Sequence, residues 1–242
     1  KLQKYINKKT KAIIPVHVSG RGSNILKLKK FAKKNKIFLI EDAAEAFFSK
    51  YKNKYLGTFG DFGTYSFYYS HQITSGEGGM ILCNSKDDYN LLKSLRAHGW
   101  DREISKRNSK NFNFINEGFN LRPMDINAAI GFNQFKRLKK LKSTRAKNRN
   151  NLIRSLKSSK KWNNQYTFFN PQKNLDPSWF GLPLMLNNKK IDSKNRFLKY
   201  LNRNKIETRP IISGNFVNQP AINKYNIKYK KSELKNSQEI ED

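Results

Sequence analysis

Short apolar runs and helical patterns alternate along the first part of the chain. Residues 11–18, KAIIPVHV, form an apolar run that predicts a buried strand, which Gly20 interrupts. A helix should follow, capped by Ser23 or Asn24. The next strand is predicted over 37–40, IFLI, and its unbroken apolar character indicates that both faces of the sheet are covered.

Two further strands are predicted, over 64–67 and over 80–83. Strand, helix and strand in this order predict an α/β layered sheet. From Met124 to about Lys157 the pattern is that of one long helix with apolar side chains on one side. Those side chains are Ile126, Ala129, Ile130 and Phe135.

A second set of elements is predicted in the last third of the chain. It comprises a strand over 182–186, a helix over 192–202 and a strand near 207–209. We therefore expect two domains: residues 1–140 as part of a large domain, and residues 141–242 as the long helix with part of a small C-terminal α/β domain.

Composition excludes several classes of protein. The chain has 242 residues, 37% of them hydrophobic, with 17 Phe and 11 Tyr, which excludes a disordered chain. We find no apolar run long enough to cross a bilayer and no secretion pattern at the start. The single Cys83 excludes a disulfide framework and a cysteine-built metal site. We expect a soluble cytoplasmic protein with no membrane partner and no bound metal.

The formal net charge of +31 raises the question of nucleic-acid binding. However, the lysines are spread along the whole chain and lie between apolar residues at helical spacing, as in 27–36. That spacing is typical of solvated helix faces. Lysine and asparagine are both abundant, which indicates a compositional bias of the source genome. We expect no nucleic-acid partner, although a positive field also attracts small anionic ligands.

Three segments carry a family resemblance: EDAAEA at 41–46, SFYYSHQITSGEGG at 66–79 and GFNLRPMDINAAIG at 118–131. With them, the chain resembles the DegT/DnrJ/EryC1/StrS sugar aminotransferase family, fold-type I enzymes that use pyridoxal 5'-phosphate (PLP). The resemblance covers roughly residues 11–221. It implies the α/β fold of type I PLP-dependent transferases, with residues 1–140 contributing to the cofactor-binding domain and a homodimer as the assembly.

His71 is the most informative position. Most members of the family carry a lysine there, which forms the Schiff base with the cofactor. Imidazole forms no stable imine, but it moves protons. The same replacement marks one branch of the family, the sugar 3-dehydratases, which remove the C3 hydroxyl from 4-keto sugar nucleotides. Some of these use an iron–sulfur cluster, but residues 96–105 contain no cysteine, so the chain resembles the cluster-free kind acting on GDP-4-keto-6-deoxymannose.

The resemblance also implies roles for residues around His71. Asp42 would pair with the pyridine nitrogen of the cofactor and keep the ring cationic; the alternative is that it caps the following turn. Ser66 would hydrogen-bond the cofactor phosphate, or it is an ordinary strand serine. Glu45 stands where many members place a glutamine near the phenolic oxygen, a position unfavourable for a carboxylate unless a proton is held there. Alternatively, Glu45 is a solvated surface acid.

Two more positions lie further along the chain. In relatives, the residue matching Asn120 reaches the cofactor phosphate of the other subunit, which implies a homodimer with shared active sites; a turn residue is the alternative. Arg209 is a candidate for binding a substrate carboxylate or phosphate, or else it is a surface arginine. His17 and His98 are read as structural histidines.

The implied activity uses PLP and pyridoxamine 5'-phosphate (PMP), L-glutamate as amino donor, and a 4-keto-6-deoxy sugar nucleotide. His71 would act as base on the C4' carbon of the cofactor and then as acid on the leaving hydroxyl. One alternative is a sugar aminotransferase that uses another lysine. A second is a non-catalytic basic binding protein on a degenerate scaffold.

The family's N-terminal phosphate loop and its stacking aromatic have no match in the chain from Lys1 onward, and the resemblance implies a C-terminus beyond Asp242. We therefore expect the chain to be a fragment of a longer enzyme. On its own it should bind the cofactor weakly or not at all.

Overall fold

The computed structural model describes residues 2–104, 112–187, 191–225 and 227–241. The chain forms two compact units. Unit 1 comprises residues 1–147 and 171–180, and unit 2 comprises residues 148–170 and 181–242. Because residues 171–180 belong to unit 1, no single cut in the sequence separates the units.

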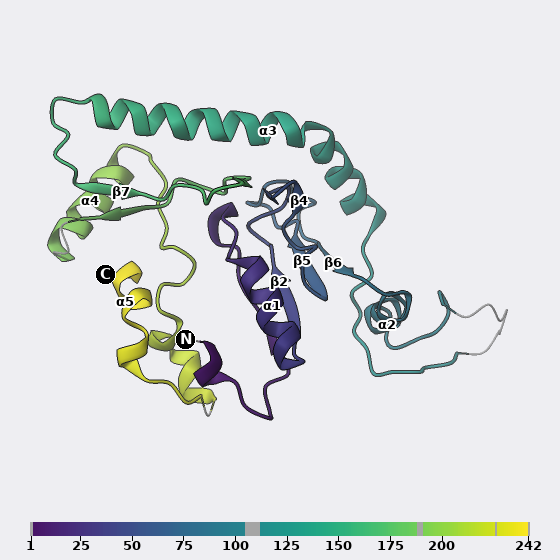
Figure 1. Cartoon of the computed structure of the whole chain (residues 1–242). Coiled ribbons are helices and arrows are strands. Elements are labelled where there is room, and N and C mark those ends of the chain that lie inside the picture. Colours follow the sequence, from purple (N-terminus) through teal and green to yellow (C-terminus); the bar gives the residue numbers. More distant parts are fainter. Residues whose placement is uncertain (1, 105–111, 188–190, 226, 242) are drawn as a thin grey trace. The chain divides into compact units, whose positions relative to one another are not determined.

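Unit 1 is built around a four-stranded mixed sheet of order β1-β2-β5-β6 (Figure 1). Its strands are β1 (Ala12–Ile13), β2 (Phe38–Asp42), β5 (Phe62–Ser66) and β6 (Gly79–Cys83). β1, β2 and β5 run parallel, and β6 is antiparallel to β5. Helix α1 (Ile25–Asn35) connects β1 to β2. The predicted α/β layered sheet is confirmed.

Helix α1 shows how the basic charge is distributed. Its N-cap is Asn24, one of the two predicted, and Lys36 ends it in the left-handed conformation at φ 54°. Ile25 and Ala32 are buried against the sheet, at 1% and 2% exposure. The lysines of the helix are exposed: Lys27, Lys29, Lys30, Lys33 and Lys34. In this helix, the basic residues form a solvated face, as the spacing predicted.

Strand β2 is covered less completely than its sequence predicted. Leu39 and Glu41 are buried, at 2% and 0% exposure, whereas Phe38 is 56% exposed and Ile40 and Asp42 are half-buried. The expectation that both faces are covered is therefore wrong for the described residues. An apolar run alone cannot tell a strand buried on both faces from one buried on a single face, because the covering elements come from elsewhere in the chain.

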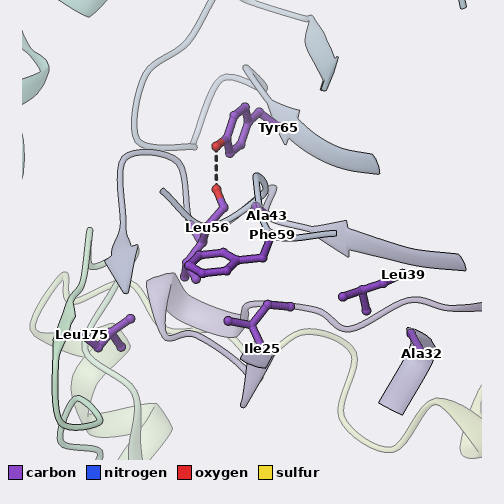
Figure 2. Packing of buried hydrophobic residues seen from close by; sticks show 9 residues of the cluster. Ile25, Ala32, Leu39, Ala43, Leu56, Phe59, Tyr65 and Leu175 are labelled. Atoms are coloured by element: carbon purple, nitrogen blue, oxygen red, sulfur yellow. Dashed lines mark hydrogen bonds between the residues drawn. The ribbon is translucent and has the colours of Figure 1, made fainter. Parts of the chain in front are cut away.

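One hydrophobic cluster forms the core of unit 1 (Figure 2). Its members come from α1, β2, β5, the connection between β2 and β5, and β8 (Leu175–Asp176): Ile25, Ala32, Leu39, Ala43, Ala46, Leu56, Phe59, Tyr65 and Leu175. The hydroxyl of Tyr65 donates to the carbonyl of Leu56 over 2.5 Å, which satisfies its polar end inside the core.

Smaller elements complete unit 1. The hairpin of β3 (Lys50–Tyr51) and β4 (Lys54–Tyr55) pairs with β8 (Leu175–Asp176). Helix α2 (Lys86–Arg96) follows β6, and its N-cap Ser85 accepts a hydrogen bond from the Asp88 amide. Two 3-10 turns, η1 (Leu2–Tyr5) and η2 (Val18–Gly20), precede α1.

Helix α3 (Asp125–Ser158) confirms the predicted long helix. Within unit 1 its less exposed stripe mixes polar and apolar residues: Asn127, Gly131, Gln134, Leu138, Leu141, Lys142, Arg145 and Ala146. The apolar side that the sequence indicated is exposed instead, with Ile126 at 66%, Ile130 at 43% and Phe135 at 51%. This arrangement leaves an apolar surface on α3 without a covering element in the described structure.

Unit 2 contains the antiparallel pair β7 (Tyr166–Phe168) and β9 (Leu184–Leu186), then α4 (Ile191–Arg203). Short helices follow: η3 (Phe216–Asn218), η4 (Pro220–Lys224), η5 (Lys231–Glu233) and α5 (Lys235–Glu241).

The strand predicted near 207–209 is wrong, since this segment is irregular. Lys205, at φ 57°, turns the chain away from α4, and the Ile206 amide closes the turn on the Leu201 carbonyl. Pro210 directly afterwards has no N–H to donate to a ladder. A strand needs a partner, and no neighbouring strand pairs with these described residues.

Candidate active site

Asp42 ends β2 at the carboxyl edge of the sheet, where open α/β sheets bind ligands. Its backbone is fixed by bonds from the Asp42 amide to the Pro15 carbonyl at 3.0 Å and from the His17 amide to the Asp42 carbonyl at 2.9 Å. Its Oδ1 accepts the Ala44 amide at 3.0 Å. The turn-capping interpretation is therefore correct, but this bond uses only one of the two carboxylate oxygens.

The residue before it, Glu41, is a fully buried carboxylate that the sequence gave no reason to single out. Its Oε2 accepts from Nε2 of His17 and from the Gly57 amide, each at 2.9 Å. Its Oε1 accepts from the amides of Phe59 at 2.5 Å and Gly60 at 2.7 Å. Burial raises the pKa of Glu41, but the bonds from His17 and the two glycine amides outweigh it, so the pKa is lowered overall.

His17 is structural, and its hydrogen bonds define its tautomer. Nδ1 accepts from the Ser23 amide at 3.0 Å, so the proton is on Nε2, which donates to Glu41. The ring thereby ties the loop after β1 to the end of β2. The backbone of Asp42 is therefore held by this loop, through Pro15 and the buried His17.

Ser66 ends β5, next to β2 in the sheet, and pairs with Gly79 of β6. A twelve-residue loop, 67–78, connects these two strands. The Phe67 amide donates to the Gly78 carbonyl at 2.8 Å and closes the loop at its base. Oγ of Ser66 accepts from the Tyr68 amide at 3.2 Å. Its hydroxyl thus lies where the loop begins, at the carboxyl end of a parallel strand.

His71 lies inside this loop and is half-buried. Its amide donates to the Tyr68 carbonyl at 3.0 Å. The imidazole makes an edge contact with Phe180, at 5.4 Å between ring centroids and 84° between planes. A second edge contact joins it to Tyr68 at 5.7 Å. His71 is thus enclosed by two aromatic rings and is not a surface histidine.

Gln72 connects the His71 loop to the turn that follows Asp42. Its Nε2 donates to the carbonyl of Glu45 in a very short bond. Glu45 itself is 7% exposed, and its Oε2 accepts the Ser19 amide at 2.7 Å. The interpretation of Glu45 as a solvated surface acid is wrong; its role near a cofactor phenolic oxygen stays a prediction.

The other two candidate residues lie elsewhere. Asn120 is exposed and forms a bridge with Ala97, just after α2. It is not among the candidates that lie at or after the carboxyl ends of β2 and β5, which are Asp42, Glu45, Ser66 and His71. Arg209 belongs to unit 2, where it is exposed in the irregular segment after α4. The roles of both residues stay predictions.

Three supporting residues were missed from the sequence. Besides Gln72, Asn127 of α3 donates to the Ser75 carbonyl at 2.6 Å and holds the far side of the His71 loop. Nη1 of Arg145 donates to the carbonyls of Trp179 at 3.1 Å and Phe180 at 3.2 Å, and burial lowers the pKa of this arginine. The sequence signal of Asn127 and Arg145 was only that of polar residues in a helical pattern, and Gln72 had no signal beyond its place next to His71 in the motif.

The gathered side chains suit a PLP-type cofactor. Asp42 offers a carboxylate for a protonated ring nitrogen, and Ser66 offers a hydroxyl for a phosphate. His71 offers an imidazole at the edge of the same sheet. Among the described residues, no group of three or more His, Cys, Asp or Glu could hold a metal ion. No helix in the described part of the chain has the length and hydropathy needed to cross a membrane.

The comparisons agree with this donor set. The chain is 32% identical over 235 residues to the GDP-4-keto-6-deoxy-D-mannose 3-dehydratase of Escherichia coli O55:H7, covering 93% of the chain and 59% of that protein. A solved structure of the E. coli enzyme with bound hydrated PLP matches with a TM-score of 0.86 at 31% identity, covering 99% of the chain and 63% of that structure. Another, with a trapped PLP-glutamate geminal diamine, matches with a TM-score of 0.86 at 30% identity, with coverages of 99% and 63%.

The chain thus spans about three fifths of the length of these relatives. The model of the DegT/DnrJ/EryC1/StrS aminotransferase family matches residues 1–242. The match extends over the whole chain, so it includes the sheet edge with Asp42, Ser66 and His71. The chain belongs to the DegT/DnrJ/EryC1/StrS aminotransferase family.

Proposed function

We propose that this protein is a PLP- and PMP-dependent sugar-nucleotide 3-dehydratase. Its substrate would be a 4-keto-6-deoxy sugar nucleotide of the GDP-4-keto-6-deoxymannose type, from which it removes the C3 hydroxyl in deoxysugar biosynthesis. One observation carries the proposal: Gln72 ties the loop of His71 to the turn after Asp42. The motif of this loop resembles the segment that carries the Schiff-base lysine in most members of the family, with His71 in place of that lysine. The relatives with dehydratase activity support it, as named above.

Each residue of the site would have a defined task. Asp42 would hold its negative charge against the pyridine nitrogen and keep that nitrogen protonated. Ser66 would bind the cofactor phosphate, and Asn120 would bind the phosphate in the partner subunit. When bound, the cofactor supplies an electron sink for charge that develops next to its ring. Glu45 lies in the turn after Asp42, and we assign it no role in the reaction.

His71 would carry the proton transfers. The imidazole would accept a proton from the C4' position of a bound cofactor and would donate it to the departing C3 hydroxyl of the sugar, which would leave as water. An imidazole can both accept and donate a proton, so one residue can serve first as base and then as acid. Phe180 and Tyr68 shield the ring from solvent on two sides.

L-Glutamate would supply the amino group of PMP, consistent with the PLP–glutamate adduct in the related structure. A homodimer is also part of the proposal. It is supported by the exposed apolar side chains of residues 112–135, which include Phe112, Phe114, Phe119, Leu121, Met124, Ile126, Ile130, Phe132 and Phe135. Asn120 lies within this segment, exposed as a residue reaching a partner should be. We place the enzyme in the cytoplasm, where the free Cys83 stays reduced.

The aminotransferase alternative requires a lysine to replace the missing amine. Lys142 makes contacts in unit 1, but its Nζ is held by Asp176 at 2.6 Å and by the Phe48 carbonyl at 3.2 Å. Lys142 is therefore engaged in structural contacts within unit 1. Product analysis separates dehydration from aminotransfer.

The test uses the full-length protein with GDP-4-keto-6-deoxymannose, L-glutamate and PLP. Mass spectrometry should show a product that has lost the C3 oxygen, together with release of ammonia. His71→Asn should abolish this product, a loss of about 10²–10⁴-fold or more in rate, while the absorbance of bound cofactor persists. An amino sugar as the wild-type product, or undiminished dehydration by His71→Asn, would refute the proposal. Tight, salt-sensitive DNA or RNA binding without a cofactor spectrum would favour the binding-protein alternative.

A further inference from the structure

Gln72 is the most deeply buried polar residue of the His71 loop. It is 3% exposed, and Ile73 beside it is 5% exposed, whereas Tyr69 on the other side of His71 is 67% exposed. The loop is therefore anchored directly after His71 and open to solvent before it. A buried glutamine costs free energy unless its amide is hydrogen-bonded, so its bonds have to be accounted for.

The amide nitrogen of Gln72 bridges two carbonyls from distant segments. It donates to Glu45 in the short bond described above and to Ser178 at 3.1 Å. Two carbonyl acceptors around one amide end identify that end as the NH₂ group. The Oε1 atom is buried and has no hydrogen-bond partner in the part of the chain that the structure describes. An apolar side chain of this size would avoid that cost, but it would leave the carbonyls of Glu45 and Ser178 without this donor.

The acceptors of Gln72 are themselves rigidly held. The Ser178 amide donates to Oγ of Ser49 at 2.8 Å, and that hydroxyl donates to the Gly20 carbonyl at 2.9 Å. A Cβ built on Gly20 would lie 2.1 Å from the Ser178 carbonyl oxygen, so the two backbones touch. Ser49 is fully buried and Ser178 is 1% exposed. Gln72 therefore fastens the loop to a fixed framework.

The ring that packs on His71 belongs to the same framework. Phe180 follows Ser178 by two residues, and Arg145 binds its carbonyl at 3.2 Å. Because Gln72 holds Ser178 to the loop, it also fixes the spacing between the His71 backbone and Phe180. A covalently tethered lysine is aligned by its bond to the cofactor, but an imidazole has no such bond. Its position has to come from contacts within the protein.

We infer that Gln72 is a positioning residue for His71: its two amide bonds hold the imidazole where proton transfer occurs. The inference rests on the proposed function, since it assigns Gln72 to the same reaction. Gln72→Met keeps the side-chain volume and removes both donors. Tyr65→Phe is the control, because it also removes a buried donor to a carbonyl in unit 1 but does not touch the His71 loop.

In the full-length protein, Gln72→Met should lower kcat by about 10²-fold, the effect of a catalytic group misplaced by about 1 Å. KM and the cofactor absorbance should change little. Histidine ring labelling and NMR give a readout that does not require turnover. The chain has three histidines, and His71→Asn assigns the signal. Gln72→Met should broaden or split the His71 resonances only, and Tyr65→Phe should leave them and kcat unchanged.

Wild-type kcat with unchanged His71 resonances in Gln72→Met would overturn the inference and leave the proposed function intact. Altered His71 resonances in a protein whose wild type performs no dehydration would uphold the positioning role and reject the proposed function. If Gln72→Met does not fold, Gln72→Glu serves instead. The carboxyl group of Gln72→Glu can donate a hydrogen bond only when it is protonated. As the pH falls and this group gains its proton, the His71 resonances should return toward those of the wild type. A His71 signal unperturbed across the whole pH range would overturn the inference.

Discussion

Nε2 of His17 donates a hydrogen bond to Oε2 of Glu41 over 2.9 Å, and both side chains are fully buried. Together with three backbone amides, His17 saturates this carboxylate at the end of β2. The next residue is Asp42, the proposed partner of the cofactor ring. Asp42, the acid proposed to act in the site, is therefore positioned by the buried Glu41, which has a structural role.

Glu41→Gln should destabilise unit 1. The glutamine NH₂ group would face backbone donors that now bind an oxygen, leaving buried groups unsatisfied at about 1–3 kcal/mol each. Denaturant unfolding of the variant measures the loss. Glu103→Gln is the matched control: Glu103 is exposed and pairs with Arg96 at 2.8 Å, so its loss should cost less than about 1 kcal/mol. Equal midpoints for the two variants would contradict the assigned role of Glu41.

Acid should destabilise the protein through the same carboxylate. The folded-state pKa of Glu41 lies below its unfolded value, because bonds from His17 and two glycine amides outweigh the effect of burial. The folded state therefore binds the proton more weakly than the unfolded state. The stabilisation is complete above the unfolded pKa of about 4.3 and is lost as the pH falls through the folded value. Unfolding curves from pH 7 to pH 3 should show this loss, and Glu41→Gln should reduce it.

Asp42→Asn should remove the negative charge of this side chain and keep its hydrogen bond to the backbone. The asparagine oxygen can still accept the Ala44 amide, so the turn should persist. The charge against the pyridine nitrogen is lost, and kcat should fall by about 10²-fold or more, as for the loss of a preorganised electrostatic partner. Steady-state kinetics on the full-length enzyme test this. Asp87→Asn, on exposed α2, is the control; a similar fall there would show that the effect is not specific to the site.

Ser66→Ala should weaken cofactor binding. A hydrogen bond to a charged phosphate is worth about 1.5–3 kcal/mol, which is roughly a 10- to 150-fold rise in dissociation constant. Titration of the cofactor absorbance measures it. Ser143→Ala on α3, whose hydroxyl is exposed and bonds only its own helix, should leave the constant unchanged. An unchanged dissociation constant of the cofactor in Ser66→Ala would show that Ser66 does not bind the phosphate.

The double variant Ile126→Glu with Ile130→Glu should weaken the proposed homodimer. Both side chains are exposed within the chain, so its own fold should tolerate the charges. At the proposed interface, the two buried carboxylates should weaken the free energy of association by at least about 2 kcal/mol. This corresponds to a rise of roughly 30-fold in the dissociation constant of the dimer. Sedimentation velocity gives the association state. Tyr200→Glu, an exposed aromatic on α4, is the control. A dimer of undiminished affinity would place the interface elsewhere.

The sequence by itself determined the strands of the sheet, the helices α1, α3 and α4, and the motif containing His71. These depend on local periodicity, on capping residues and on fixed offsets along the chain, which a sequence shows directly. It did not exclude a strand at 207–209, because a strand also requires a partner.

Only the tertiary structure decided which polar residues are buried and what they bind. Nothing in the sequence shows that Glu41, Glu45 and Gln72 are buried, yet each contacts groups 16 to 106 positions away. Likewise, the periodicity of α3 defined an apolar side but not its direction, and a mixed stripe from Asn127 to Ala146 is the less exposed one. Such choices depend on which distant segments pack together, and the free energy of those contacts outweighs local preference.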